Sequence, residues 1–84
     1  MNHFPLSVSI PLASLKPGER ATFLQFDSGR GVMGRLIALG FTPGAEVRIT
    51  QNHGRGPLLV AVRGTYVAIG RGEAEKIFVR RAAA

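Results

Sequence analysis

The glycine-rich stretch at residues 29–34, GRGVMG, is the pattern in this sequence that comes nearest to a known chemistry. It matches G-x-G-x-x-G, whose glycines let a strand-to-helix turn approach the pyrophosphate of a dinucleotide. That chemistry also needs a doubly wound sheet, and 84 residues are too few to build one. We therefore interpret the stretch as a flexible connection between a strand and a short helix.

Groups that bind metals or act as nucleophiles are few and scattered. His3 and His53 lie far apart in expected loops, and the chain has no cysteine, no H-x-x-x-H and no paired carboxylates. No transition-metal ligand set is therefore indicated. No serine lies in a G-x-S-x-G motif, and the five carboxylates form no evident acid and base pair. We predict that the protein is not an enzyme and has no cofactor, no catalytic residue and no metal site.

The charge of the chain favours an anionic partner. Eleven basic and five acidic residues give a net charge of +6, which suits a nucleic acid, an acidic protein face or an anionic membrane surface. The arginines fall at fairly even intervals, whereas a nucleic-acid-binding arm clusters its basic residues. Tyr66, close to Arg63, is the best candidate for stacking on a base. We expect nucleic-acid binding to be unlikely, and a small basic nucleic-acid-binding barrel remains the alternative function.

The length of the chain and its many turn-forming residues indicate one small β domain. We expect a single domain over residues 1–84 with its core at about 10–80, because a chain of 84 residues has room for one core. Eleven glycines and five prolines favour short strands and many turns. No apolar run approaches the ~20 residues of a membrane span, and no signal-peptide pattern is visible. With no cysteine for disulfides, we expect a cytoplasmic protein without membrane insertion.

Turn signals and alternation predict where the elements lie. Strands are expected at residues 20–26, 47–50, 58–63, 66–69 and 77–79, with one helical turn at 73–76. The Pro-Gly pairs at 17–18 and 43–44 predict two type II turns. Two sheets of so few strands cannot each hide a face, whereas a strongly bent barrel can. The sequence therefore predicts a mainly β fold, a small SH3-like barrel of five to six short strands with one short inserted helix.

The inserted helix is expected over residues 32–39. Gly40 stands where a left-handed C-cap is needed, Phe41 follows where it can contact the helix, and Pro43 prevents continuation. Spacing at one helical turn defines the side that faces the barrel. That buried stripe comprises Val32, Leu36 and Leu39, widened by Met33 and Ile37.

One run of residues resembles a known family. The string RLIALGFTPG at 35–44, with Gly56-Pro57, the strand at 67–69 and the pattern EAxxIxV at 73–79, resembles the FeoA family. These are small SH3-like accessory proteins of bacterial ferrous iron uptake, and the resemblance covers roughly residues 12–80. A related barrel is the last domain of some metal-dependent transcription repressors, after a winged-helix domain that these 84 residues do not contain. A metal-sensing SH3-like domain is therefore a further alternative.

The resemblance implies a function and a partner. FeoA-like proteins are regulatory accessories that bind the cytoplasmic GTP-binding part of the ferrous iron transporter FeoB. Two positions depart from the family pattern. Many relatives carry Arg where this chain has Gly70, and an acidic residue where it has Gly56. A partner contact that relatives make through these two positions is therefore not carried over to this chain, whereas the expected fold is unaffected.

We expect the partner to bind on the helix and the loops near it. Gly34 lies ~200° around the helix from the buried Val32, so it leaves the outer backbone open. Arg35 borders the buried stripe and can reach solvent along its long side chain. Guanidinium groups suit an acidic protein face. The predicted partner-binding residues are Arg30, Gly34, Arg35, His53 and Arg55.

Overall fold

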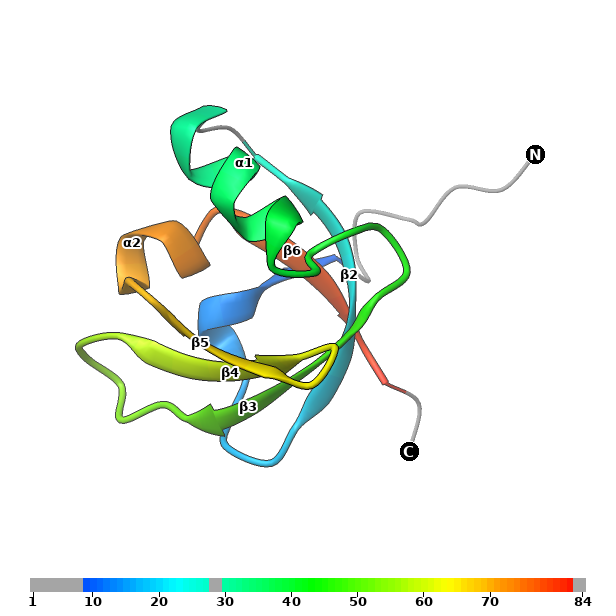
Figure 1. The fold of residues 1–84 in the computed structure, drawn as a ribbon. Helices are drawn as coiled ribbons and strands as arrows, with labels where there is room; N and C mark the ends of the chain where they lie inside the picture. Colours follow the sequence, from blue (N-terminus) through cyan, green and yellow to red (C-terminus); the bar gives the residue numbers. More distant parts are fainter. Residues whose placement is uncertain (1–8, 28–29, 83–84) are drawn as a thin grey trace.

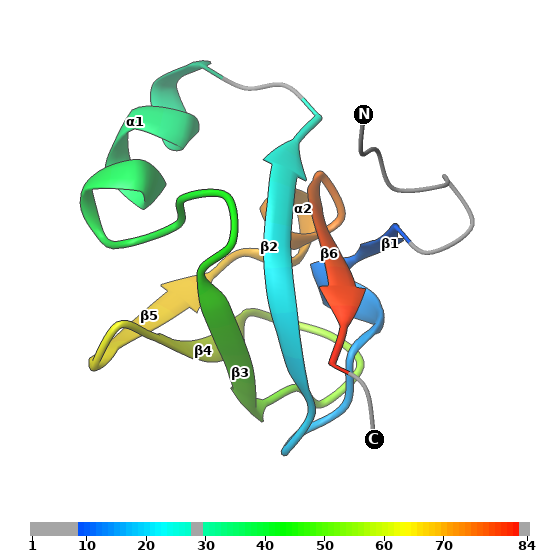
Figure 2. The same cartoon turned by 90° about the vertical axis from the view of Figure 1, so that its right-hand side faces the viewer.

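Six antiparallel strands form a single sheet in the order β1-β6-β2-β3-β4-β5. A computed structural model describes residues 9–27 and 30–82, and the side chains of residues 30–33 lie outside that description. The strands are β1 (Ile10–Pro11), β2 (Arg20–Phe26), β3 (Glu46–Gln51), β4 (Leu58–Val62), β5 (Thr65–Ile69) and β6 (Ile77–Arg81). The helices are α1 (Arg30–Ala38) and α2 (Arg71–Ala74), with a 3₁₀ turn over Leu12–Ser14. Figures 1 and 2 show the sheet curled on itself, with α1 set against one end of the curl. The predicted mainly β, SH3-like architecture is confirmed.

The two Pro-Gly turns close the β2–β3 pair at both of its ends. Gly18 and Gly44 each have a φ of 90°, which the third position of a type II turn requires. The amide of Gly18 donates to the carbonyl of Ile49 at 2.7 Å, and that of Gly44 donates to the carbonyl of Phe23 at 2.9 Å. The turn before β2 is therefore hydrogen-bonded to β3, and the turn before β3 is hydrogen-bonded to β2.

The core lies inside the curl and is made by alternate residues of the strands. Buried side chains alternate with less buried ones along the whole of β4 and along the middle of β3 and the end of β5, as the period of an extended strand requires. The ring of Phe23 packs edge-on against that of Phe41, with centroids 5.9 Å apart, and so joins β2 to the end of α1. Burying each such large apolar side chain contributes ~1.5–3 kcal/mol. Among the residues that the structure describes, no polar or charged residue is buried.

The C-terminus of α1 has the predicted cap. Gly40 has a φ of 115°, and its amide donates to the carbonyl of Ile37 at 3.0 Å. The amide of Phe41 donates to the carbonyl of Leu36, also at 3.0 Å. These two bonds define a Schellman motif, and the full burial of both Leu36 and Phe41 supplies its apolar contact.

The exposure of Ile37 corrects the predicted buried stripe. Its side chain is 46% exposed, whereas Leu36 is fully buried and Leu39 is half-buried. Ile37 lies ~100° around the helix from Leu36. The side of α1 that contacts the barrel is narrower than this angle, so the side chain of Ile37 stays outside the contact. The predictions for Val32 and Met33 fall on side chains outside the described part of the chain.

Element boundaries differ from the predicted ones by up to two residues. The helix spans Arg30–Ala38 instead of 32–39, and the helical turn spans Arg71–Ala74 instead of 73–76. β4 ends at Val62, because Arg63 has a φ of 48° and starts a two-residue hairpin turn into β5. β6 continues to Arg81, which pairs with Ala21 of β2. Neither helix in the described ranges has the length and apolar character needed to cross a bilayer.

Candidate protein-docking surface

The predicted partner-binding residues occupy two separate segments. Gly34 and Arg35 are exposed on α1, and His53 and Arg55 are exposed in the loop between β3 and β4. Arg30 is the first residue of α1, and its side chain lies outside the described part. Figure 1 shows α1, α2 and the β3–β4 loop one below another along the same side of the molecule. The short helix α2 therefore stands between the two predicted segments.

An ion pair connects α1 to α2. The Nη2 atom of Arg35 lies 3.4 Å from Oε1 of Glu73, and the two side chains are 49% and 34% exposed. An exposed pair of this kind contributes ~0–1 kcal/mol, because water and salt screen it. Arg35 can therefore exchange Glu73 for a carboxylate of a partner at little cost in stability.

A stronger set of contacts connects α2 to the β3–β4 loop. The Nη2 atom of Arg71 donates to Oδ1 of Asn52 at 2.6 Å, and its Nε donates to the carbonyl of Gly56 at 3.2 Å. The amide of Gly54 donates to the same Oδ1 of Asn52 at 3.0 Å, which forms a local turn. The loop is thus held at both of its ends by one guanidinium. The sequence analysis missed Arg71, since nothing in the local pattern indicates which loop it reaches.

Asn52 also anchors the loop to the start of the chain. Its Nδ2 atom donates to the carbonyl of Leu15 at 2.7 Å and to that of Ala13 at 3.1 Å. This side chain uses its oxygen and its nitrogen for four hydrogen bonds in total, which exhausts its usual capacity. His53 and Arg55 are consequently presented on an anchored loop, with their side chains toward solvent.

An apolar hollow lies beside the outer side of α1. It has a volume of about 370 Å³, and Ile37 forms one of its walls. The other lining residues are Phe23, Leu24, Gln25, Phe26, Phe41, Thr42 and Pro43. On the helix next to it, a Cβ built on Gly34 would meet nothing within 4 Å. Among the described residues of α1, the outer side therefore offers the open backbone of Gly34, the exposed side chain of Ile37 and the guanidinium of Arg35.

Within residues 9–27 and 30–82, no group of three or more His, Cys, Asp or Glu side chains is placed to hold a metal ion. The backbone amide of Lys16 and, after it, the side chain of Arg81 hold the pKa of Glu19 below its ordinary value of 4.5. Glu19 joins the first turn to β6 and lies outside the predicted docking segments.

Known proteins resemble this chain over most of its length. The chain is 39% identical over 72 residues to a candidate Fe(2+) transport protein A of Methanocaldococcus jannaschii, covering 86% of this chain and 87% of the relative. A crystal structure of an iron uptake regulatory protein, FeoA, superposes with a TM-score of 0.81 at 31% identity, covering 88% of this chain and 99% of that one.

A second solved structure connects the fold to a described architecture. FeoA of Stenotrophomonas maltophilia in complex with zinc, described as a prokaryotic SH3-domain protein, superposes with a TM-score of 0.74 at 31% identity. The superposition covers 83% of this chain and 88% of that protein. The model of the FeoA domain family matches residues 10–81. With this match over nearly the whole barrel, the chain belongs to the FeoA family.

Proposed function

We propose that this chain is a non-enzymatic, cytoplasmic accessory protein of ferrous iron transport that binds the cytoplasmic GTP-binding part of a FeoB-type transporter. Membership of the FeoA family supports the transport role. The binding role is supported by the exposed features on the outer side of α1. There Ile37 stands 46% exposed beside an apolar hollow, next to the open backbone of Gly34.

This combination is typical of a protein-docking site. An exposed aliphatic side chain at the edge of an apolar hollow loses water contact when a partner covers it. Arg35 lies one residue from Gly34 and adds charge complementarity to an acidic partner. The β3–β4 loop, with His53 and Arg55, extends the same side of the molecule beyond α2. We propose that α1 is the centre of the contact and that the loop is its rim.

The first test is a pull-down of the FeoB cytoplasmic part with this protein, with and without guanine nucleotide. We expect binding by the natural chain, and its absence under both conditions would overturn the proposal. Ile37→Ser should weaken binding about tenfold, since burial of such a side chain contributes ~1.5–3 kcal/mol. The control Lys76→Ser changes an exposed residue outside the predicted segments and should bind normally.

A charge exchange separates a contact with the partner from a structural role of Arg35. Arg35→Glu places two carboxylates together at α1 and α2, and we expect it to weaken binding. The double variant Arg35→Glu, Glu73→Arg restores an ion pair within the chain but not a guanidinium at position 35. If Arg35 contacts the transporter, the double variant stays weak. Recovery of full binding by the double variant would show that Arg35 acts only through Glu73.

A further inference from the structure

A row of side chains crosses the outer face of the sheet on four neighbouring strands. Arg20 of β2 pairs in register with Arg48 of β3, Arg48 pairs with Ala61 of β4, and Ala61 pairs with Tyr66 of β5. Because residues in register on adjacent strands share one face, these side chains stand side by side toward solvent. Arg20, Arg48 and Tyr66 are exposed, and Tyr66 is 64% exposed.

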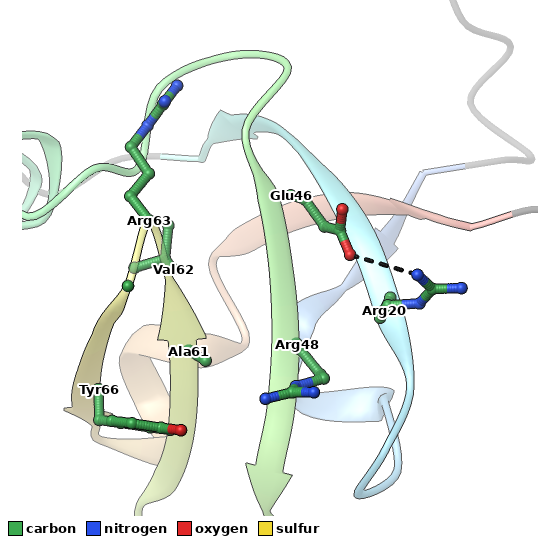
Figure 3. A pocket seen from close by; sticks show the side chains of 8 residues that line it. Arg20, Glu46, Arg48, Ala61, Val62, Arg63 and Tyr66 are labelled. Carbon is green, nitrogen blue, oxygen red and sulfur yellow. Dashed lines mark ion pairs between the residues drawn. The ribbon is translucent and has the colours of Figure 1, made fainter.

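The small side chain in this row leaves a depression. An open hollow of about 430 Å³ lies over Ala61, with Arg48 on one side and Tyr66 on the other. Figure 3 shows the side chains of Arg48 and Tyr66 reaching toward one another across β4. The remaining lining residues are Arg20, Glu46, Val62, Arg63 and Gly64. Of the residues predicted to bind the transporter, the four whose side chains are described, Gly34, Arg35, His53 and Arg55, do not line this hollow.

The three arginines that line the hollow differ in the contacts that their guanidinium groups make within the chain. The Nη1 atom of Arg20 lies 3.7 Å from Oε2 of Glu46, and both side chains are more than half exposed. Arg63 donates to Gly40 and Thr42, away from the hollow. Arg48 has no ion pair or side-chain hydrogen bond within the described ranges. The hollow thus has one unengaged guanidinium at its centre and one weakly held guanidinium beside it.

We propose that this face binds an extended acidic peptide segment of a partner protein. Carboxylates would pair with Arg48 and Arg20, whose planar guanidinium forks match the geometry of a carboxylate. Side chains two residues apart share one face of an extended peptide at a spacing of ~6.6 Å, and adjacent strands of the sheet lie ~4.8 Å apart, so carboxylates at alternate peptide residues can reach both arginines. An aliphatic side chain further along the peptide then fills the space over Ala61 against the ring of Tyr66. The Arg20–Glu46 pair already shows one carboxylate held on this face.

The charge on the face favours a peptide over a nucleic acid. Duplex DNA carries one negative charge per ~1.7 Å of its axis, a denser line of charge than Arg20 and Arg48 can neutralise on this face. Tyr66 is the single aromatic ring in the row, whereas stacking grooves for single strands carry successive rings. A short segment with two carboxylates and one aliphatic side chain matches the two arginines and the depression together.

The test uses the labelled peptide Gly-Glu-Gly-Asp-Gly-Leu-Gly-Ser, whose Glu, Asp and Leu share one face when it is extended, and its amide counterpart Gly-Gln-Gly-Asn-Gly-Leu-Gly-Ser. Binding is measured by fluorescence anisotropy at low salt and located by amide shift mapping on the ¹⁵N-labelled protein. We expect the acidic peptide to shift the amides of Arg48, Ala61 and Tyr66, and the amide peptide to bind at least tenfold more weakly. Equal binding of both peptides, or shifts confined to α1, would overturn the proposal.

Three variants sharpen the result. Arg48→Gln should weaken binding of the acidic peptide about tenfold, whereas the charge-matched control Lys76→Gln should change it by less than twofold. Glu46→Gln should strengthen binding, because it releases Arg20. An equal effect of Arg48→Gln and Lys76→Gln would show that only net charge matters and would refute the site.

Tighter binding of a short oligothymidylate that depends on Tyr66 would reassign the face to nucleic acid. This face lies apart from the proposed transporter contact, so either proposal can fail alone.

Discussion

The side chain of Arg63 holds the end of α1 through the carbonyl of Gly40. Its Nε donates to that carbonyl at 3.3 Å, and its Nη2 donates to the hydroxyl of Thr42 at 3.1 Å. The β4–β5 hairpin therefore supports the turn that ends the helix. Because α1 leans on the barrel along a narrow stripe, this contact helps to fix the orientation of the candidate docking surface.

Gly40→Ala should lower the free energy of unfolding by about 1 kcal/mol or more. The φ of 115° strains any residue with a Cβ, and a Cβ here would lie 3.0 Å from Cδ of Arg63. The measurement is a urea melt. Gly34→Ala is the matched control within α1, and it should instead stabilise by about 0.5–1 kcal/mol, because alanine favours a helix. If Gly40→Ala were no less stable to urea than Gly34→Ala, the helix cap at Gly40 would be contradicted.

Two variants of Arg63 separate the cost of its backbone strain from the contribution of its side-chain hydrogen bonds to stability. With a φ of 48° it is the only non-glycine residue in a positive-φ conformation within residues 9–27 and 30–82. Arg63→Ala should cost about 1–2 kcal/mol, since it keeps the strain and loses both bonds. Arg63→Asn should cost less, because asparagine accepts this conformation in two-residue hairpin turns. Chemical denaturation measures both, and equal losses would mean that backbone strain contributes nothing.

Asn52→Ala should lower the free energy of unfolding by about 2 kcal/mol. It removes four hydrogen bonds and leaves the carbonyls of Ala13 and Leu15 without this donor. Thermal and urea melts measure the loss, with His53→Ala as a neighbouring control that should change stability by less than about 0.5 kcal/mol. Similar melts for both variants would show that the loop is not anchored through Asn52.

Asn52→Asp provides a second comparison at the same position. It keeps an oxygen for Arg71 and for the amide of Gly54, but it replaces the two-donor nitrogen with an acceptor that faces two carbonyls. We expect a loss of stability smaller than that of Asn52→Ala, because the new carboxylate pairs with Arg71. A larger loss than that of Asn52→Ala would show that repulsion from the carbonyls outweighs the ion pair.

Acid should weaken the fold partly through Glu19. Its pKa is lowered in the folded chain from 4.5 by the amide of Lys16 and then by Arg81. Its contribution is therefore complete above about pH 4.5 and is lost as the pH falls through the lower folded value. Glu19→Gln should show a flatter dependence of stability on pH in this acidic range. A Glu75→Gln control should follow the natural chain, and identical slopes for all three proteins would refute the role of Glu19.

Features that depend on neighbours along the chain could be predicted from the sequence. The type II turns at Gly18 and Gly44, the cap at Gly40 and the alternation of β3 each follow from local backbone limits or from the period of a strand. Even there, the exposure of Ile37 was missed, because helical period gives an angle but not the width of the contact with the barrel.

Contacts between distant residues were decided by the tertiary structure. Arg35 meets Glu73, Arg71 meets Asn52, and Arg63 meets Gly40, and no local pattern distinguishes these arginines from the others. The short helix α2 contacts both α1 and the β3–β4 loop, through Glu73 and Arg71. The row from Arg20 to Tyr66 exists only because four strands pair in one register. Register and curl are set by how the whole core packs, so a solvent-facing arrangement of this kind appears only once the chain has folded.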